Sequence, residues 1–292
     1  MSAAAARAWA ALALVFNALT WGVSWWPFRQ LQGLGLHPLW LTAIMFSLAL
    51  PALLVARPAA LGELLRTPAL WLLAGAAGMT NACFNWAVTT GDVVRVVLLF
   101  YLMPLWAVLL ARPLLGERIG ARAASRVALA LSGALVVLWP DHGGWPQPRG
   151  LADWLGLAGG FTFALNNVLL RRAARQSGAA RALAMFGGGA LVALGLALGL
   201  TLAGAVTPPP APAPAWLLGT ALLAAWFILS NLALQYGAAR LQAHTTAVIM
   251  MTEVFFASAS ALALGAGQLG WRTVVGGVLI LGGAALAAWR RD

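Results

Sequence analysis

Residues 81–104, NACFNWAVTTGDVVRVVLLFYLMP, and residues 231–254, NLALQYGAARLQAHTTAVIMMTEV, are related stretches that begin 150 positions apart. This offset of 150 positions pairs Asn81 with Asn231, Asn85 with Gln235, Trp86 with Tyr236, Arg122 with Arg272, Gly133 with Gly283, and Trp139 with Trp289. A second offset, of 142 positions, pairs Trp21 with Phe163. The chain is therefore predicted to contain two copies of one unit, residues 1–140 and 141–292. In membrane proteins, a doubled unit usually holds its binding site where the copies face each other.

The composition is typical of a membrane protein. Hydrophobic residues make up 62% of the 292 residues and charged residues only 9%, whereas a soluble domain carries about 25% charged residues. Ten apolar segments are long enough to cross a bilayer, at residues 8–28, 38–56, 68–88, 94–112, 122–139, 151–171, 180–203, 215–236, 243–264 and 272–289. These segments are too long and continuous for barrel strands, so they must be helices. We predict an all-α integral membrane protein with ten transmembrane helices.

The arginines predict the orientation of these helices. The net charge of +11 would fit a nucleic-acid-binding protein, but the 18 basic residues are all arginines and gather at the ends of the apolar segments. With a cytoplasmic N-terminus, 14 arginines lie inside and four outside, as the positive-inside rule requires. Five helices per unit is an odd number, so the second unit enters the membrane from the opposite side. We predict two inverted five-helix repeats around a central cavity, cytoplasmic termini and no nucleic-acid partner.

All the asparagines fall within the predicted helices, at Asn17, Asn81, Asn85, Asn166, Asn167 and Asn231. A spacing of four residues places Asn17, Trp21 and Trp25 on one helix face, and likewise Asn81 with Asn85. For any one asparagine, a hydrogen bond between helices, worth roughly 0.6 to 2 kcal/mol, is an equally good explanation. For the set as a whole, we favour the polar lining of a shared cavity.

Glu253 is the one acid well inside a predicted helix. A carboxyl group at this depth is costly and usually functional. Glu253 could pair with a substrate ammonium, carry a proton, or bond to a neighbouring helix while protonated. Its counterpart Met103 is apolar, so we expect a chemically asymmetric cavity. Pro104, the next residue, removes a backbone hydrogen bond and is predicted to kink its helix.

Other sequence features bear on the class of protein. Aromatic residues at mid-helix could line a pocket for a flat, apolar ligand, although packing explains any single ring as well. The single cysteine and the three histidines have no metal-ligand spacing, and no nucleophile lies near a base. We therefore expect no metal, no cofactor and no enzymatic activity.

Three short motifs resemble those of a known family. Residues 101–104 (YLMP), 115–118 (LGER) and 253–255 (EVF), with the inverted repeats, resemble the EamA branch of the drug/metabolite transporter superfamily. Trp21 and the Tyr-Leu-x-Pro stretch are most similar to the YddG-type aromatic amino-acid exporters. This resemblance implies a bacterial inner-membrane protein that exports amino acids by alternating access. The sequence departs from it at Met103, where tryptophan is expected, and at Val254, where proline is common.

These arguments together give a predicted substrate site. Its residues are Trp21, Trp25, Asn81, Asn85, Trp86, Tyr101, Met103, Phe163, Asn167, Trp226, Asn231 and Glu253. We expect the amides to contact the amino-acid backbone, Glu253 to lie near the ammonium, and the helix bundles to rock around Pro104. The coupling remains open between facilitated uniport and proton exchange. The alternative is a multidrug or cationic-solute transporter that uses Glu253 as a cation or proton site. The expected partners are the substrate and the lipid bilayer, and a monomer suffices.

Overall fold

The structure, a computed structural model, describes residues 3–115, 121–140, 145–238, 240–241 and 243–289. These residues form fourteen α-helices and no strand, which confirms the all-α prediction. The helices are α1 (Ala3–Val23), α2 (Trp25–Gly33), α3 (Pro38–Ala56), α4 (Ala59–Arg66), α5 (Pro68–Thr90), α6 (Val93–Phe100), α7 (Met103–Leu115), α8 (Ala121–Leu138), α9 (Leu151–Arg172), α10 (Gly178–Leu202), α11 (Pro214–Ala238), α12 (Ala243–Met250), α13 (Thr252–Ala263) and α14 (Trp271–Trp289). Residues 116–118 of the predicted family motif lie outside the described residues.

Within the described part of the chain, five helical segments are long and apolar enough to cross a membrane, by length and composition. They are Ala5–Gly33, Pro38–Ala56, Val93–Leu114, Gly178–Leu202 and Pro214–Ala238. Three further apolar helices are shorter, at Val127–Leu138, Thr252–Ala263 and Trp271–Gly283. Helices α5 and α9 have 23 and 22 residues, but polar side chains interrupt their apolar sequence. The protein is thus a multi-pass membrane protein, and the count of ten spans stays a prediction.

Three of the predicted segments are each divided into two helices. Segment 94–112 is interrupted at Tyr101 and Leu102, and segment 243–264 at Met251, which is 150 positions after Tyr101. Segment 8–28 is interrupted at Ser24. Pro104 is the second residue of α7, so the interruption lies just before the proline. The first turn of a helix tolerates proline because the N–H groups there have no partner within the helix.

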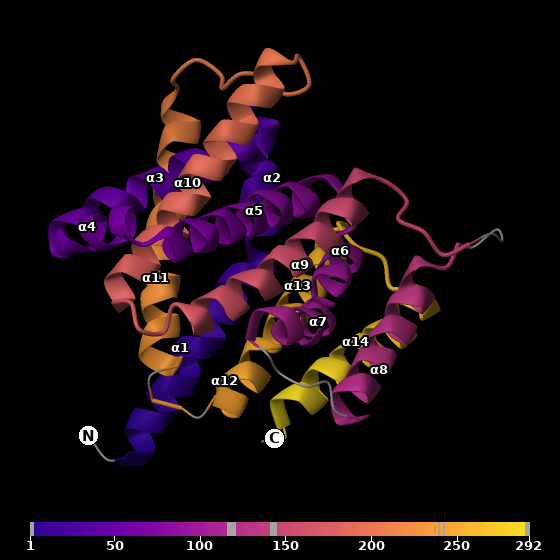
Figure 1. Cartoon of the computed structure of the whole chain (residues 1–292). Coiled ribbons are helices and arrows are strands. Elements are labelled where there is room, and N and C mark those ends of the chain that lie inside the picture. The colour runs from indigo at the N-terminus through magenta and orange to yellow at the C-terminus, as the bar shows by residue number, and fades with distance from the viewer. Residues whose placement is uncertain (1–2, 116–120, 141–144, 239, 242, 290–292) are drawn as a thin grey trace.

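The helices pack in antiparallel and crossing pairs around the interrupted helices (Figure 1). Helix α1 packs against α11 and α13, and α9 packs against α5 and α7. Two further pairs are α3 with α10 and α8 with α14. The start of α1 and the end of α14 lie at the same end of the bundle (Figure 1). Helices α8 and α14 approach closely because Gly133 and Gly276 each face the other's carbonyl oxygen, where a Cβ atom would collide.

Candidate functional site

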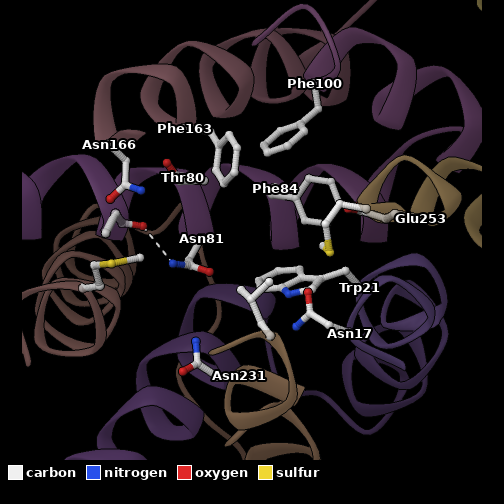
Figure 2. Close-up of a pocket in the computed structure, with 14 residues that line it drawn as sticks. Asn17, Trp21, Thr80, Asn81, Phe84, Phe100, Phe163, Asn166, Asn231 and Glu253 are labelled. Carbon is white, nitrogen blue, oxygen red and sulfur yellow. Dashed lines mark hydrogen bonds between the residues drawn. The ribbon is translucent and has the colours of Figure 1, made fainter. Parts of the chain in front are cut away.

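A cavity of about 190 Å³ lies among the helices, and we call it the cavity below (Figure 2). It is lined by Asn17, Trp21, Ala77, Thr80, Asn81, Phe84, Phe100, Phe163, Asn166, Met185, Asn231, Leu234, Met250 and Glu253. Helices α1, α5, α9 and α11 provide most of these residues, while Phe100 comes from the interrupted segment 94–112 and Met250 and Glu253 come from the interrupted segment 243–264. Five of the predicted site residues therefore line the cavity: Trp21, Asn81, Phe163, Asn231 and Glu253.

Glu253 lies where the interrupted segments 94–112 and 243–264 meet. It is the second residue of α13 and only 9% exposed. Its Oε2 accepts a hydrogen bond of 3.2 Å from the hydroxyl of Tyr101, which also lies 3.4 Å from the carbonyl oxygen of Met250. Because it is in the first turn of α13, the carboxyl group also faces the positive end of a helix dipole. Tyr101 itself lies behind Glu253 and does not line the cavity.

Asn17 and Asn166 are two lining residues outside the predicted set. The Nδ2 of Asn17 donates to the carbonyl oxygen of Ser230 at 3.0 Å and to its Oγ at 2.7 Å. The Oδ1 atoms of Asn17 and Asn166 are buried and accept no hydrogen bond from any described residue. Asn167 was predicted in place of Asn166, but its side chain is exposed. One residue along a helix turns the side chain by about 100°, and here this turn leaves Asn166 in the lining and Asn167 outside it.

Asn81 and Asn231, which the 150-position offset relates, both line the cavity. The Nδ2 of Asn81 donates to the carbonyl oxygen of Ala77 at 2.8 Å, the dashed bond in Figure 2. The Oδ1 of Asn231 accepts from Nε2 of Gln235 at 2.7 Å. Each amide uses one end on its own helix. The other ends, Oδ1 of Asn81 and Nδ2 of Asn231, can turn to a ligand.

One side of the cavity is an aromatic wall of Trp21, Phe84, Phe100 and Phe163 (Figure 2). Neighbouring rings lie 4.8 to 6.0 Å apart between centroids. Edge-to-face and tilted contacts at this distance stabilise aromatic pairs. Phe84 and Phe100 were not predicted, because an isolated phenylalanine in an apolar segment looks the same whether it faces a cavity or a neighbouring helix.

Three predicted site residues lie away from the cavity in contacts between helices. Asn85 is fully buried, and its Nδ2 donates to Oγ1 of Thr42 at 3.0 Å. The Nε1 of Trp25 donates to Oγ of Ser260 at 2.9 Å. Trp86 packs edge-on against the imidazole of His37, with 5.0 Å between the ring centroids. In these residues the amide or indole joins two elements, which is the alternative that the sequence left open.

The remaining predicted residues also lie outside the lining. Trp226 is 36% exposed and donates through Nε1 to Oγ1 of Thr20 at 2.8 Å. Met103 is partly buried and packs against the apolar core around Val97 and Leu102. Asn167 faces outward, as described above. For these three residues, substrate contact stays a prediction, and the geometry favours the fourteen lining residues as the ones that contact a ligand.

A second polar cluster joins helix ends far from the termini. Arg95 and Asp153 form a two-pronged salt bridge, with Nη2 to Oδ2 at 2.8 Å and Nε to Oδ1 at 2.9 Å. Arg95 also donates from Nη1 to the carbonyl oxygen of Val137. Asp92 accepts from the backbone N–H of Arg95 at 2.9 Å and from that of Gln268 at 2.8 Å. The cluster thus ties α6, α8, α9 and the α13–α14 connection together.

Outside the membrane-crossing segments, α4 contacts the start of α10 through one carboxyl group. Glu63 accepts hydrogen bonds from the hydroxyl of Ser177 at 2.6 Å and from its backbone N–H at 2.8 Å. These two hydrogen bonds lower the pKa of Glu63 below its ordinary value, and the bond from the Ser177 hydroxyl has the larger effect. Ser177 is also the N-cap of α10. This contact therefore joins the surface helix α4 to α10.

The fold defines a multi-pass helical membrane protein with a cavity lined by polar and aromatic residues. Residues 8–139, a little under half of the chain, match the model of the EamA-like transporter family. A solved crystal structure is similar over 95% of this chain and 96% of its own, with 20% sequence identity and a TM-score of 0.56. This similarity shows a shared fold alone. No curated protein sequence matches the chain.

Proposed function

We propose that the protein exports amino acids, with aromatic and other apolar ones favoured, across the bacterial inner membrane by alternating access. The family match points to small-molecule transport and not to an enzyme. The observation that carries the finer proposal is the cavity, in which Glu253 and four asparagine amides lie beside an aromatic wall. An amino acid offers an ammonium for the carboxyl group, a carboxylate for amide N–H groups, and a side chain for the rings.

Two inverted units, residues 1–140 and 141–292, are part of this proposal. The interruptions at Tyr101 and Met251 support it, because they lie at positions related by the sequence offset. The packing supports it as well: if the units are related, the contact of α1 with α11 corresponds to that of α9 with α5. The family match, which ends at residue 139, coincides with the end of the first proposed unit. Transporters of this kind bind substrate between such units and rock one against the other.

The position of the cavity supports a conformation in which the helix bundle is closed at the end opposite to the termini. Met185 is near the start of α10, while Asn231 and Leu234 are near the end of α11, so the cavity extends toward the bundle end that holds the termini. At the other end, the Arg95–Asp153 cluster ties the helices together. If the termini are cytoplasmic, the external side is closed. Opening it requires the cluster to separate, and the interruption before Pro104 provides a place for the helix to bend.

A cationic-solute transporter is the second candidate, and one observation favours it. Glu253 is the only ionisable side chain among the described residues that line the cavity. A carboxylate-bearing substrate therefore finds amide N–H groups but no full positive charge. The same cavity accepts an organic cation with a flat ring, which can contact both the carboxyl group and the aromatic faces.

The two candidates are separated by transport into liposomes that contain the purified protein. The three probes share an indole ring: tryptophan carries an ammonium and a carboxylate, tryptamine only an ammonium, and indole-3-propionate only a carboxylate. Amino-acid export predicts saturable flux of tryptophan above that of tryptamine. Cation transport predicts the reverse order. Flux of indole-3-propionate alone would contradict both. Repeating the assay with a pH gradient distinguishes proton exchange from uniport.

A further inference from the structure

Two buried polar atoms on the cavity wall have no hydrogen-bond partner in the described part of the protein. They are Oδ1 of Asn17 and Oδ1 of Asn166, in side chains that are 1% and 3% exposed. A buried acceptor that bonds to nothing costs stability, so proteins rarely keep one without a use for it. Both atoms belong to residues that line the same cavity. A ligand that donates hydrogen bonds would satisfy them.

The orientation of the Asn17 amide is fixed by Ser230. Its Nδ2 lies 3.0 Å from the carbonyl oxygen of Ser230, which can only accept, so this end of the amide must be the N–H₂ group. The Oγ of Ser230 accepts from the same group at 2.7 Å. The opposite end of the amide is therefore an acceptor. Among the described residues, no hydrogen bond to Asn166 assigns its orientation in this way.

The surroundings of this acceptor favour a positively charged donor. Figure 2 shows Asn17, Trp21 and Glu253 on the same side of the cavity, away from Asn166 and Asn231. Glu253 supplies the one carboxyl group of the lining, and the indole of Trp21 supplies an aromatic face. An ammonium group can donate to both oxygens and lie against the ring. A carboxylate at this place would meet two oxygen acceptors and be repelled.

The related position in the other unit lacks this feature. The 150-position offset pairs Ser230 with Thr80, and the 142-position offset pairs Asn17 with Gly159. There the hydroxyl of Thr80 donates to the hydroxyl oxygen of Thr162 at 3.1 Å, with no amide between the helices. At this position the contact between α1 and α11 thus carries an amide, whereas the related position on α9 is the glycine Gly159. An ammonium site on one side only would orient an asymmetric substrate.

We infer that Oδ1 of Asn17 and the carboxyl group of Glu253 together bind the protonated amine of the substrate, and that Ser230 is a positioning residue that holds the Asn17 amide in place. This inference rests on the proposed function, because it assigns the part of the substrate that enters this side of the cavity. It also assigns the ligand class: a compound with an ammonium group and a flat apolar portion.

Binding to the purified full chain, measured calorimetrically in detergent, tests the inference. The variants are Asn17→Leu, Ser230→Ala and the double variant, in which neither helix keeps an unpaired partner. Asn17→Leu should weaken tryptamine and tryptophan at least about tenfold, the loss expected when a hydrogen bond to a charged group is removed. It should leave any affinity for indole-3-propionate unchanged. Ser230→Ala should weaken the two amines less, because the backbone carbonyl of residue 230 still accepts from Nδ2 of Asn17 and only the bond to Oγ is lost. Ser230→Thr keeps the hydroxyl and should bind the amines as the wild type does.

Asn85→Leu is the matched control, since Asn85 is another buried amide between helices but does not line the cavity. It should lower thermal stability and leave amine binding intact. If folded Asn17→Leu and the double variant bind tryptamine as the wild type does, the inference is wrong while the proposed function stands. If the wild type binds tryptamine but not tryptophan, and Asn17→Leu loses it, amino-acid export is wrong while the inference stands. If the wild type binds neither amine, both are wrong.

Discussion

The hydroxyl of Tyr101 lies 3.2 Å from Oε2 of Glu253, and this hydrogen bond connects the interruption between α6 and α7 to the one between α12 and α13. Interrupted helices expose backbone groups that must find partners inside a membrane protein. The same hydroxyl lies 3.4 Å from the carbonyl oxygen of Met250, the last residue of α12. One side chain thus serves both the carboxyl group of the cavity and the end of a broken helix.

Tyr101→Phe should lower the free energy of unfolding by about 1 kcal/mol, the usual net value of one buried hydrogen bond. The ring stays and the core packing is kept, so the loss reports the hydroxyl alone. Denaturant unfolding in detergent measures it. Tyr236→Phe is the control, because the described structure gives that hydroxyl no hydrogen bond. Equal stability of Tyr101→Phe and the wild type would show that the bond contributes nothing.

Glu253→Gln should lower the flux of ammonium-bearing indoles at least about tenfold, since an amide replaces a charge-assisted partner. The variant keeps the size of the side chain and an acceptor for Tyr101. Flux in liposomes, measured with and without a pH gradient, shows whether Glu253 also carries the coupled proton. If the proton moves through Glu253, the variant loses all response to the gradient. Wild-type flux in the variant would remove Glu253 from the site.

Asp153→Asn should destabilise the protein by about 3–5 kcal/mol, because it leaves the Arg95 guanidinium in a mostly buried place without its counter-charge. The two side chains are 14% and 7% exposed, so water replaces the lost contact poorly. Thermal unfolding measures the change. We also expect faster labelling of cysteines placed near Gln268, since the cluster holds that end of the bundle together. An unchanged melting temperature would mean that the salt bridge between Arg95 and Asp153 does not stabilise the contacts between these helix ends.

Acid should weaken the contact between α4 and α10. The pKa of Glu63 is lowered in the folded protein by the hydrogen bonds from Ser177. Between the folded and the ordinary pKa, the folded state therefore binds fewer protons than the unfolded state does. This contribution to stability is present above the ordinary pKa of 4.5 and is lost as the pH falls through the folded value. Glu63→Gln should therefore lose less stability than the wild type between pH 6 and pH values below 4.5. Parallel acid profiles for both proteins would contradict this role.

Helicity and the membrane class follow from composition, because an apolar chain of this kind has few ways to satisfy its backbone in lipid. The positions of Glu253 and of Asn81 with Asn231 on the cavity also follow from depth and from the repeat. The sequence does not predict which amide side chains face the cavity and which face a neighbouring helix. Asn85 has the same residue type and spacing as Asn81, yet it binds Thr42 between α3 and α5. The interruptions at Tyr101 and Met251 bring Tyr101 and Glu253 together, and in the sequence only Pro104 indicated one of these interruptions.

Tryptophan flux through Asn166→Leu, beside Asn167→Leu, is the most direct measurement of whether the cavity is the substrate site. These residues are adjacent on α9, but Asn166 lines the cavity and Asn167 is exposed. We predict that Asn166→Leu loses most of its flux, keeps its fold and melts no lower than the wild type, because the change removes a buried Oδ1 that has no hydrogen-bond partner among the described residues. Asn167→Leu should transport normally. Normal flux through Asn166→Leu, with flux lost in Asn167→Leu, would contradict the assignment.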